Sequence, residues 1–165
     1  MNQPIDNLRR TEDGKIIQGA AHTCKVINHK NRNKIIIKAV CDLRKIKDSF
    51  DSIVCCGISG LLVAPQVAEI LNKNLVIVRK PDEQCYSDFL IEGAAPYLYV
   101  ILDDLICSGS TLKWIKNTLY EDCPKAKCFG AYYYMPEECA YDISTEKLFY
   151  QRYKTKLLNP APPRK

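Results

Sequence analysis

The chain has 165 residues, of which 47% are hydrophobic, and its 24 Lys and Arg outnumber its 19 Asp and Glu for a net charge of +5. This composition excludes a disordered, collagen-like or fibrous chain, and the length predicts one globular domain with a full core. The mild positive charge suits a small anionic ligand. Because Lys and Arg do not form blocks, we expect no nucleic-acid partner and no membrane surface.

Nine cysteines would fit a disulfide scaffold in a secreted protein. Residues 1–6 are polar and lack the apolar stretch of a secretory signal, so we expect the protein to be cytoplasmic, in a reducing compartment. No apolar run approaches the ~20 residues of a membrane span. A structural zinc site would need unusual spacings among His22, Cys24 and His29 or between Cys123 and Cys128. We therefore interpret most thiols as small buried apolar groups.

The first third of the chain carries weaker patterns than the rest. Residues 15–18 and 34–37 each contain adjacent isoleucines and are predicted to be short strands, and residues 43–50 are a candidate helix. We expect these elements to form an appendage or an extra sheet edge.

Four near-continuous apolar, β-branched runs follow, as is typical of strands covered on both faces. They span residues 52–56, 74–78, 97–102 and 127–135. Two helical patterns lie among them. Residues 61–71 place apolar side chains on one face, with Pro65 in an early turn, and residues 111–122 do the same before Pro124 ends the pattern.

Strands that alternate with helices predict an α/β fold with a mainly parallel central sheet flanked by helices. We expect a single domain over residues 1–158, with its core at about residues 50–135, and a frayed tail over residues 159–165.

The most informative stretch is the end of the third apolar run. Asp103 and Asp104 follow it directly, and a loop of small and hydroxyl residues leads into the next helix. Such a loop offers backbone N–H groups, hydroxyls and the positive end of a helix dipole to a phosphate. The two carboxylates would repel phosphate but accept hydrogen bonds from vicinal sugar hydroxyls, so the pattern indicates ribose 5-phosphate.

The plain alternative is a polar strand terminus followed by an ordinary helix N-cap. Two other nucleotide sites do not fit this sequence. A P-loop requires a G-K-[ST] signature, and a dinucleotide site requires G-x-G-x-x-G after a strand.

At these residues the sequence resembles the type I phosphoribosyltransferases, which use 5-phosphoribosyl-1-pyrophosphate (PRPP). The family motif is a hydrophobic strand, two acidic residues, two apolar residues and a small-residue loop, and the resemblance covers about residues 50–135. It implies that Asp103 and Asp104 are the catalytic pair. It also implies that the 5′-phosphate is bound by Cys107, Ser108, Gly109, Ser110 and Thr111.

Two further segments fall where this family binds pyrophosphate. The first is the turn after the first core strand, and the second is the basic pair after the next one. Their residues are Cys56, Gly57, Ile58, Ser59, Gly60, Arg79 and Lys80. A plain strand-to-helix turn and a solvated charge pair are the alternatives. Residues 81–92 correspond to a mobile lid, and they depart from the orotate-using members because they contain no basic residue.

The resemblance implies transfer of ribose 5-phosphate from PRPP to a nitrogenous base with release of pyrophosphate. It implies Mg²⁺ on the pyrophosphate and sugar oxygens, a small N- or C-terminal hood and a homodimer. A PRPP- or nucleotide-binding regulator without chemistry is the alternative that the acidic lid favours, and a structural protein on the same scaffold is a third. The aromatic residues of the last predicted strand could stack on a base, but aromatic residues in a strand are more often part of the core. These residues are Phe129, Tyr132, Tyr133 and Tyr134.

Overall fold

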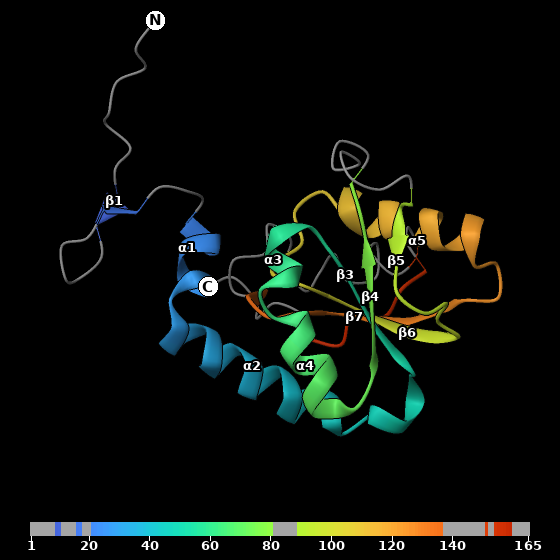
Figure 1. Ribbon diagram of the computed structural model, residues 1–165, viewed down its shortest axis with the longest axis horizontal. Coiled ribbons are helices and arrows are strands. Elements are labelled where there is room, and N and C mark those ends of the chain that lie inside the picture. Colours follow the sequence, from blue (N-terminus) through green and yellow to red (C-terminus); the bar gives the residue numbers. More distant parts are fainter. Residues whose placement is uncertain are drawn as a thin grey trace, which may run out of the picture.

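The computed structural model describes residues 21–80, 89–136, 151 and 154–159, together with the backbone of two short strands before them. At its centre is a five-stranded sheet in the order β5-β4-β3-β6-β7. The strands are β3 (Ser52–Cys56), β4 (Asn74–Val78), β5 (Ile91–Glu92), β6 (Leu98–Asp103) and β7 (Lys127–Tyr133). Every neighbouring pair is parallel except β4 and β5. The sheet is the core of the molecule in Figure 1.

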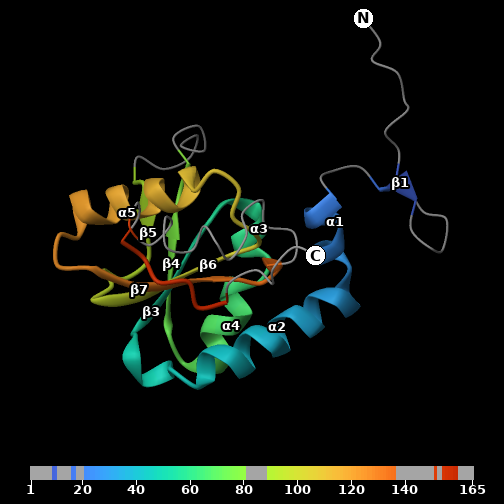
Figure 2. The same cartoon turned by 180° about the vertical axis from the view of Figure 1, so that it is seen from behind.

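Helices cover both faces of this sheet. On one face lie α2 (His29–Arg44) and α4 (Ala64–Leu71), and on the other lies α5 (Ser110–Asp122), as Figures 1 and 2 show from opposite sides. Two apolar clusters follow this division, one built around α2 and α4 and the other around α5. The predicted α/β class with a mainly parallel, doubly covered sheet is confirmed.

The four predicted core strands are present, with small shifts at their ends. Continuous apolar sequence forms them because both faces are covered, and all five residues of β3 are buried. The last strand ends at Tyr133 rather than at residue 135. Beyond it, the N–H groups of Tyr134 and Met135 still bond to the carbonyls of Asp103 and Asp104.

The predicted helix over residues 61–71 is two helices, α3 (Gly57–Leu61) and α4. Pro65 stands in the first turn of α4, where its missing N–H is not required, and it could not occupy the interior of one longer helix. The break between the two helices follows from this proline.

Two predictions for the N-terminal part were wrong. Residues 34–37 lie inside α2 instead of forming a strand, and α2 ends at Arg44, before one 3-10 turn, η1 (Lys47–Ser49), where a helix over 43–50 was expected. Asn28 caps α2 by accepting from the N–H groups of Lys30 and Asn31. Before it lie α1 (Ala21–Ile27) and a separate antiparallel pair, β1 (Arg9–Arg10) and β2 (Ile16–Ile17), so the strand predicted at 15–18 is present.

A C-terminal segment adds to the edge of the sheet beside β7. Ala131 exchanges backbone hydrogen bonds with Lys156 and Leu158, at 2.9 Å each, and Leu157 is buried. Gly130 permits this approach, since a Cβ there would lie 2.8 Å from the Leu158 side chain. Asn159, the first residue of the predicted tail, is part of the folded structure, and residues 160–165 lie outside the described residues.

Candidate functional site

The predicted motifs meet where the strand order of the sheet reverses. From the central strand β3 the chain moves to β4 on one side and later returns to β6 on the other. In open α/β sheets, ligands bind beyond the carboxyl ends of the strands at such a switch point. Cys56 ends β3 and Asp103 ends β6, so both predicted phosphate loops begin at this position.

A cavity of about 180 Å³ opens there. The predicted site residues among those that line it are Cys56, Ser59, Lys80, Asp103, Asp104, Cys107, Ser108, Gly109, Ser110 and Thr111. The lining also includes residues that the motif analysis did not assign to the site, namely Ile101, Leu105, Ile106, Leu112 and Tyr133. Strand alternation could have indicated Ile101, which is two residues before Asp103 and shares its face.

The two carboxylates are nearly buried, with exposed fractions of 7% for Asp103 and 6% for Asp104. Asp103 Oδ1 accepts hydrogen bonds from Ser59 Oγ at 3.1 Å and from the N–H of Asp104 at 2.9 Å, and Asp104 Oδ1 accepts from the N–H of Leu105 at 2.8 Å. Burial, and then the neighbouring Asp104, raise the pKa of Asp103 to about 7. A carboxyl group that can change its charge near neutral pH therefore faces the cavity.

The loop before α5 forms a turn with the features of an anion site. Gly109 adopts φ 75°, in the left-handed region that glycine favours, and it caps the helix. The first backbone bond of α5 runs from the Lys113 N–H to the Gly109 carbonyl. The N–H groups of Thr111 and Leu112 thus belong to the first turn, which has no acceptor within the helix. Ser108 Oγ orders the loop through bonds with Ser110 Oγ at 2.9 Å and the Ser110 N–H at 3.3 Å.

The turn after β3 is tied to the acidic pair through Ser59. The Ser59 hydroxyl donates to Asp103, and its carbonyl accepts from Tyr134 Oη at 2.8 Å. Lys80 extends over this turn, because a Cβ on Gly57 would lie 3.4 Å from Lys80 Cε and 3.6 Å from Nζ. Gly57, Ile58 and Gly60 are part of α3 and are not among the residues that line the cavity.

Arg79 lies differently from Lys80 although the two are adjacent. Its guanidinium binds Glu92 Oε1 through Nε at 3.2 Å and Nη2 at 3.0 Å, and it is not among the lining residues. The carbonyl of Arg79 accepts a hydrogen bond from Trp114 Nε1 at 2.8 Å, which joins the end of β4 to α5. Of the expected lid, residues 81–88 lie outside the described residues, and Glu92 belongs to β5.

Comparison with solved structures identifies the fold. Orotate phosphoribosyltransferase from Aeropyrum pernix covers 93% of this chain, and 84% of its own chain, with a TM-score of 0.61 and 14% identity. Orotate phosphoribosyltransferase from Francisella tularensis covers 94% of this chain and 78% of its own chain, with a TM-score of 0.63 and 14% identity. Adenine phosphoribosyltransferase from Saccharomyces cerevisiae covers 66% of this chain and 70% of its own chain, with a TM-score of 0.53 and 22% identity.

The chain has the type I phosphoribosyltransferase fold. No protein-family model matches the sequence, and no curated protein matches it either. The likeness therefore lies in the arrangement of the elements of this phosphoribosyltransferase fold.

Most cysteines of this chain are not the buried apolar groups that were predicted. Among those in the described ranges, only Cys55 and Cys56 are buried, while Cys41 and Cys107 are exposed. Burial, with Asp103 and Cys56 as lesser causes, raises the pKa of Cys55 to about 12, so this thiol stays protonated. In the same part of the chain, no three His, Cys, Asp or Glu side chains gather to hold a metal ion, and no helix is both long and apolar enough to cross a membrane.

The raised pKa of Asp103 predicts how the stability of this phosphoribosyltransferase fold depends on pH. Because the folded pKa of about 7 exceeds the ordinary 3.8, the contribution of the protonated carboxyl is complete below about pH 4 and is lost as pH rises through about 7. Asp103→Asn is therefore expected to raise the free energy of unfolding at about pH 8 by about 1 kcal/mol or more. Urea unfolding across this pH range measures the effect.

Asp48→Asn is the matched control, because Asp48 is exposed on η1 and far from the acidic pair in sequence. Its pH profile should follow that of the unmodified protein. Equal stability of Asp103→Asn and the unmodified protein at both ends of the range would contradict the raised pKa.

Proposed function

We propose that the protein is a phosphoribosyltransferase that transfers ribose 5-phosphate from PRPP to a nitrogenous base and releases pyrophosphate. The observation that carries this proposal is the placement of two nearly buried carboxylates and the first turn of α5 around one cavity at the switch point of the sheet. This combination provides separate places for a sugar diol and for a phosphate.

In this proposal the 5′-phosphate binds in the loop before α5. The N–H groups of Thr111 and Leu112 and the hydroxyls of Ser108 and Thr111 would donate to its oxygens. The positive end of the α5 dipole favours the same charge, so the loop binds phosphate without a lysine.

The carboxylates of Asp103 and Asp104 would accept hydrogen bonds from the 2′ and 3′ hydroxyls of the ribose. When pyrophosphate leaves C1, the ribose ring gains positive charge, and fixed negative charge beside it stabilises that transition state. Since the pKa of Asp103 is about 7, a developing cation nearby would favour its ionised form.

Pyrophosphate would lie against the turn after β3, with Lys80 as its cation, because Lys80 lines the cavity and lies over Gly57. Arg79 would have to leave Glu92 before it could take part. Mg²⁺ would bind the pyrophosphate and sugar oxygens, and it fits this site because it commonly takes one or two carboxylates and completes its shell with substrate phosphates. Asp103 and Asp104 would face the bound ion, which would neutralise charge on the leaving group.

The test is incubation with PRPP, Mg²⁺ and each common nucleobase or orotate in turn, with released pyrophosphate as the readout. Base-dependent release supports the proposal. PRPP-dependent thermal stabilisation without pyrophosphate release would favour the PRPP-binding regulator, for which the Arg79–Glu92 pair is the supporting observation. If PRPP caused neither thermal stabilisation nor pyrophosphate release, both the transferase and the regulator would be ruled out.

Homodimerisation and the cytoplasmic compartment stay predictions, which light scattering and cell fractionation would check.

The phosphate loop gives a prediction that does not depend on turnover. Thr111→Val and Ser108→Ala each remove a hydroxyl donor to a charged acceptor, a bond worth about 1.5–3 kcal/mol, so each should weaken binding of a nucleoside monophosphate by about tenfold or more. Isothermal titration calorimetry measures the affinity. Ser49→Ala, outside the cavity, is the control and should leave the affinity unchanged. Wild-type affinity in both loop variants would show that phosphate binds elsewhere.

A further inference from the structure

A second cavity, of about 380 Å³, lies on the other face of β7. The last half of α2, the end of β7 and the C-terminal segment surround it. The described residues that line it are Lys38, Asp42, Leu43, Lys45, Ile46, Tyr132, Lys156, Leu157, Leu158 and Asn159. None of these residues lines the first cavity. Its volume is in the range of small-molecule sites.

The walls of this second cavity combine an apolar base with cationic side chains. Leu43 and the ring of Tyr132 are buried, and Ile46 and Leu158 are partly buried beside them. Among the described lining residues, three lysines and one aspartate supply the charges, so two positive charges have no compensating carboxylate there. A ligand that matches this surface has an apolar body and about two negative charges.

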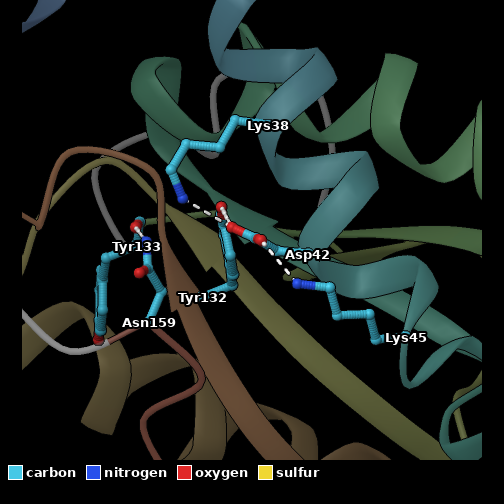
Figure 3. Close-up of polar contacts among 6 residues, drawn as sticks. All are labelled: Lys38, Asp42, Lys45, Tyr132, Tyr133 and Asn159. Atoms are coloured by element: carbon cyan, nitrogen blue, oxygen red, sulfur yellow. Dashed lines mark hydrogen bonds and ion pairs between the residues drawn. The ribbon is translucent and has the colours of Figure 1, made fainter.

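Both carboxylate oxygens of Asp42 have partners, as Figure 3 shows. Its Oδ2 accepts from Lys38 Nζ at 2.7 Å and from Tyr132 Oη at 2.9 Å, and its Oδ1 lies 3.6 Å from Lys45 Nζ. Burial opposes ionisation of Asp42, but the bonds from Lys38 and Tyr132 and the charges of Lys38 and Lys45 outweigh it, so its pKa lies below the ordinary value. The carboxylate thus stays charged and holds two of the lysines at the cavity.

Lys156 comes from the opposite wall. Its carbonyl accepts from the Ala131 N–H at 2.9 Å, which fixes its backbone against β7. Among the described residues, its ammonium makes no hydrogen bond or ion pair. An anion in the cavity would therefore meet Lys156, which has no carboxylate partner there. It would also meet Lys38 and Lys45, which share the Asp42 carboxylate.

We propose that this second cavity binds a small organic dianion of the phosphomonoester type, with its phosphate among Lys38, Lys45 and Lys156 and its apolar part against Leu43, Ile46 and Tyr132. This site is separate from the proposed PRPP cavity and does not depend on it. Phosphate is the headgroup that suits several lysine ammoniums at once, since each supplies a point charge and rotatable donors.

The two cavities nevertheless share a strand. Tyr132 faces the second cavity and the next residue, Tyr133, lines the first. Asn159 of the second cavity donates from Nδ2 to the Tyr133 carbonyl at 2.9 Å (Figure 3). The test must therefore locate the ligand by residue rather than by stability alone.

The probe is phenyl phosphate, and its binding is monitored by the chemical shifts of backbone amides in two-dimensional NMR. We expect saturable shifts of the amides of residues 42–46, 131–132 and 155–159. Lys38→Gln/Lys45→Gln/Lys156→Gln should weaken this binding by about tenfold or more, and Lys156→Gln alone, which leaves the Asp42 pairs intact, should weaken it severalfold. Ser108→Ala/Thr111→Val should leave these shifts unchanged, which separates this site from the proposed phosphate loop.

Lys30→Gln/Lys125→Gln/Lys127→Gln is the matched control, because it removes the same charge from residues that line neither cavity. Three results would overturn the proposal. The shifts could be confined to residues 107–112, the control variant could weaken binding equally, or sodium chloride at matched ionic strength could cause the same shifts. Equal affinity for inorganic phosphate would also overturn it, because the apolar wall would then contribute nothing.

Discussion

Asp104→Asn is expected to lower the rate of phosphoribosyl transfer by about 100-fold or more, with the fold intact. In the proposed function, the substitution removes a negative charge beside the ribose, where positive charge would develop. The amide oxygen of Asn can still accept the Leu105 N–H bond that Asp104 Oδ1 accepts, so the loop keeps this bond. Initial rates of pyrophosphate release, with PRPP and base varied separately, measure the effect on kcat and on KM.

Asp103→Asn provides an internal check on this result. It is expected to lose activity while gaining stability above neutral pH, so that unfolding cannot explain the loss. Asp48→Asn, which alters an exposed carboxylate on η1, should retain full activity. Wild-type turnover and PRPP affinity in the double variant Asp103→Asn/Asp104→Asn would show that the acidic pair does not bind the sugar.

Gly60→Val should be the most damaging small substitution in the turn after β3. A Cβ at residue 60 would lie 2.8 Å from the Cβ of Cys55 and 3.4 Å from the Leu102 carbonyl, both on the central strands. Overpacking of this kind costs about 1–3 kcal/mol. Because α3 must move away from the sheet to relieve it, the neighbouring Ser59 would also lose its bond to Asp103. The midpoint temperature of thermal unfolding and the affinity for PRPP are both expected to decrease.

Ile58→Val is the matched control, since Ile58 lies on the same helix but is exposed. It should leave stability within about 0.5 kcal/mol of the unmodified protein. If Gly60→Val were as stable as this control, the close packing of α3 on β3 would not hold in solution.

The central sheet could be predicted because its signal is local. β3 and β6 are apolar at nearly every position, as buried parallel strands require, and the motif from Asp103 to Thr111 follows β6 without interruption. Chain order placed the acidic pair and the phosphate loop next to each other, and the switch in strand order brought the turn after β3 beside them.

The errors arose where tertiary contacts decide between two local readings. Three consecutive isoleucines, residues 35–37, suit a strand, yet the Asn28 cap and the burial of Ile36, Ala39, Val40 and Leu43 against α4 and the sheet make this segment helical. Likewise, adjacency of Arg79 and Lys80 predicted a shared role, but their partners lie in different directions. The second cavity joins Lys38 to Lys156, and no sequence pattern relates such distant residues.

The bond between Trp114 and the Arg79 carbonyl has a practical consequence. Trp114 is the only tryptophan in the chain, and it stands one turn into the helix whose first turn would hold the phosphate. Its indole is therefore a native optical reporter in contact with the strand end that precedes the expected lid. Emission excited selectively from Trp114 would follow ligand binding in real time, without any label, and, if the proposed function holds, would give the order in which PRPP and base bind.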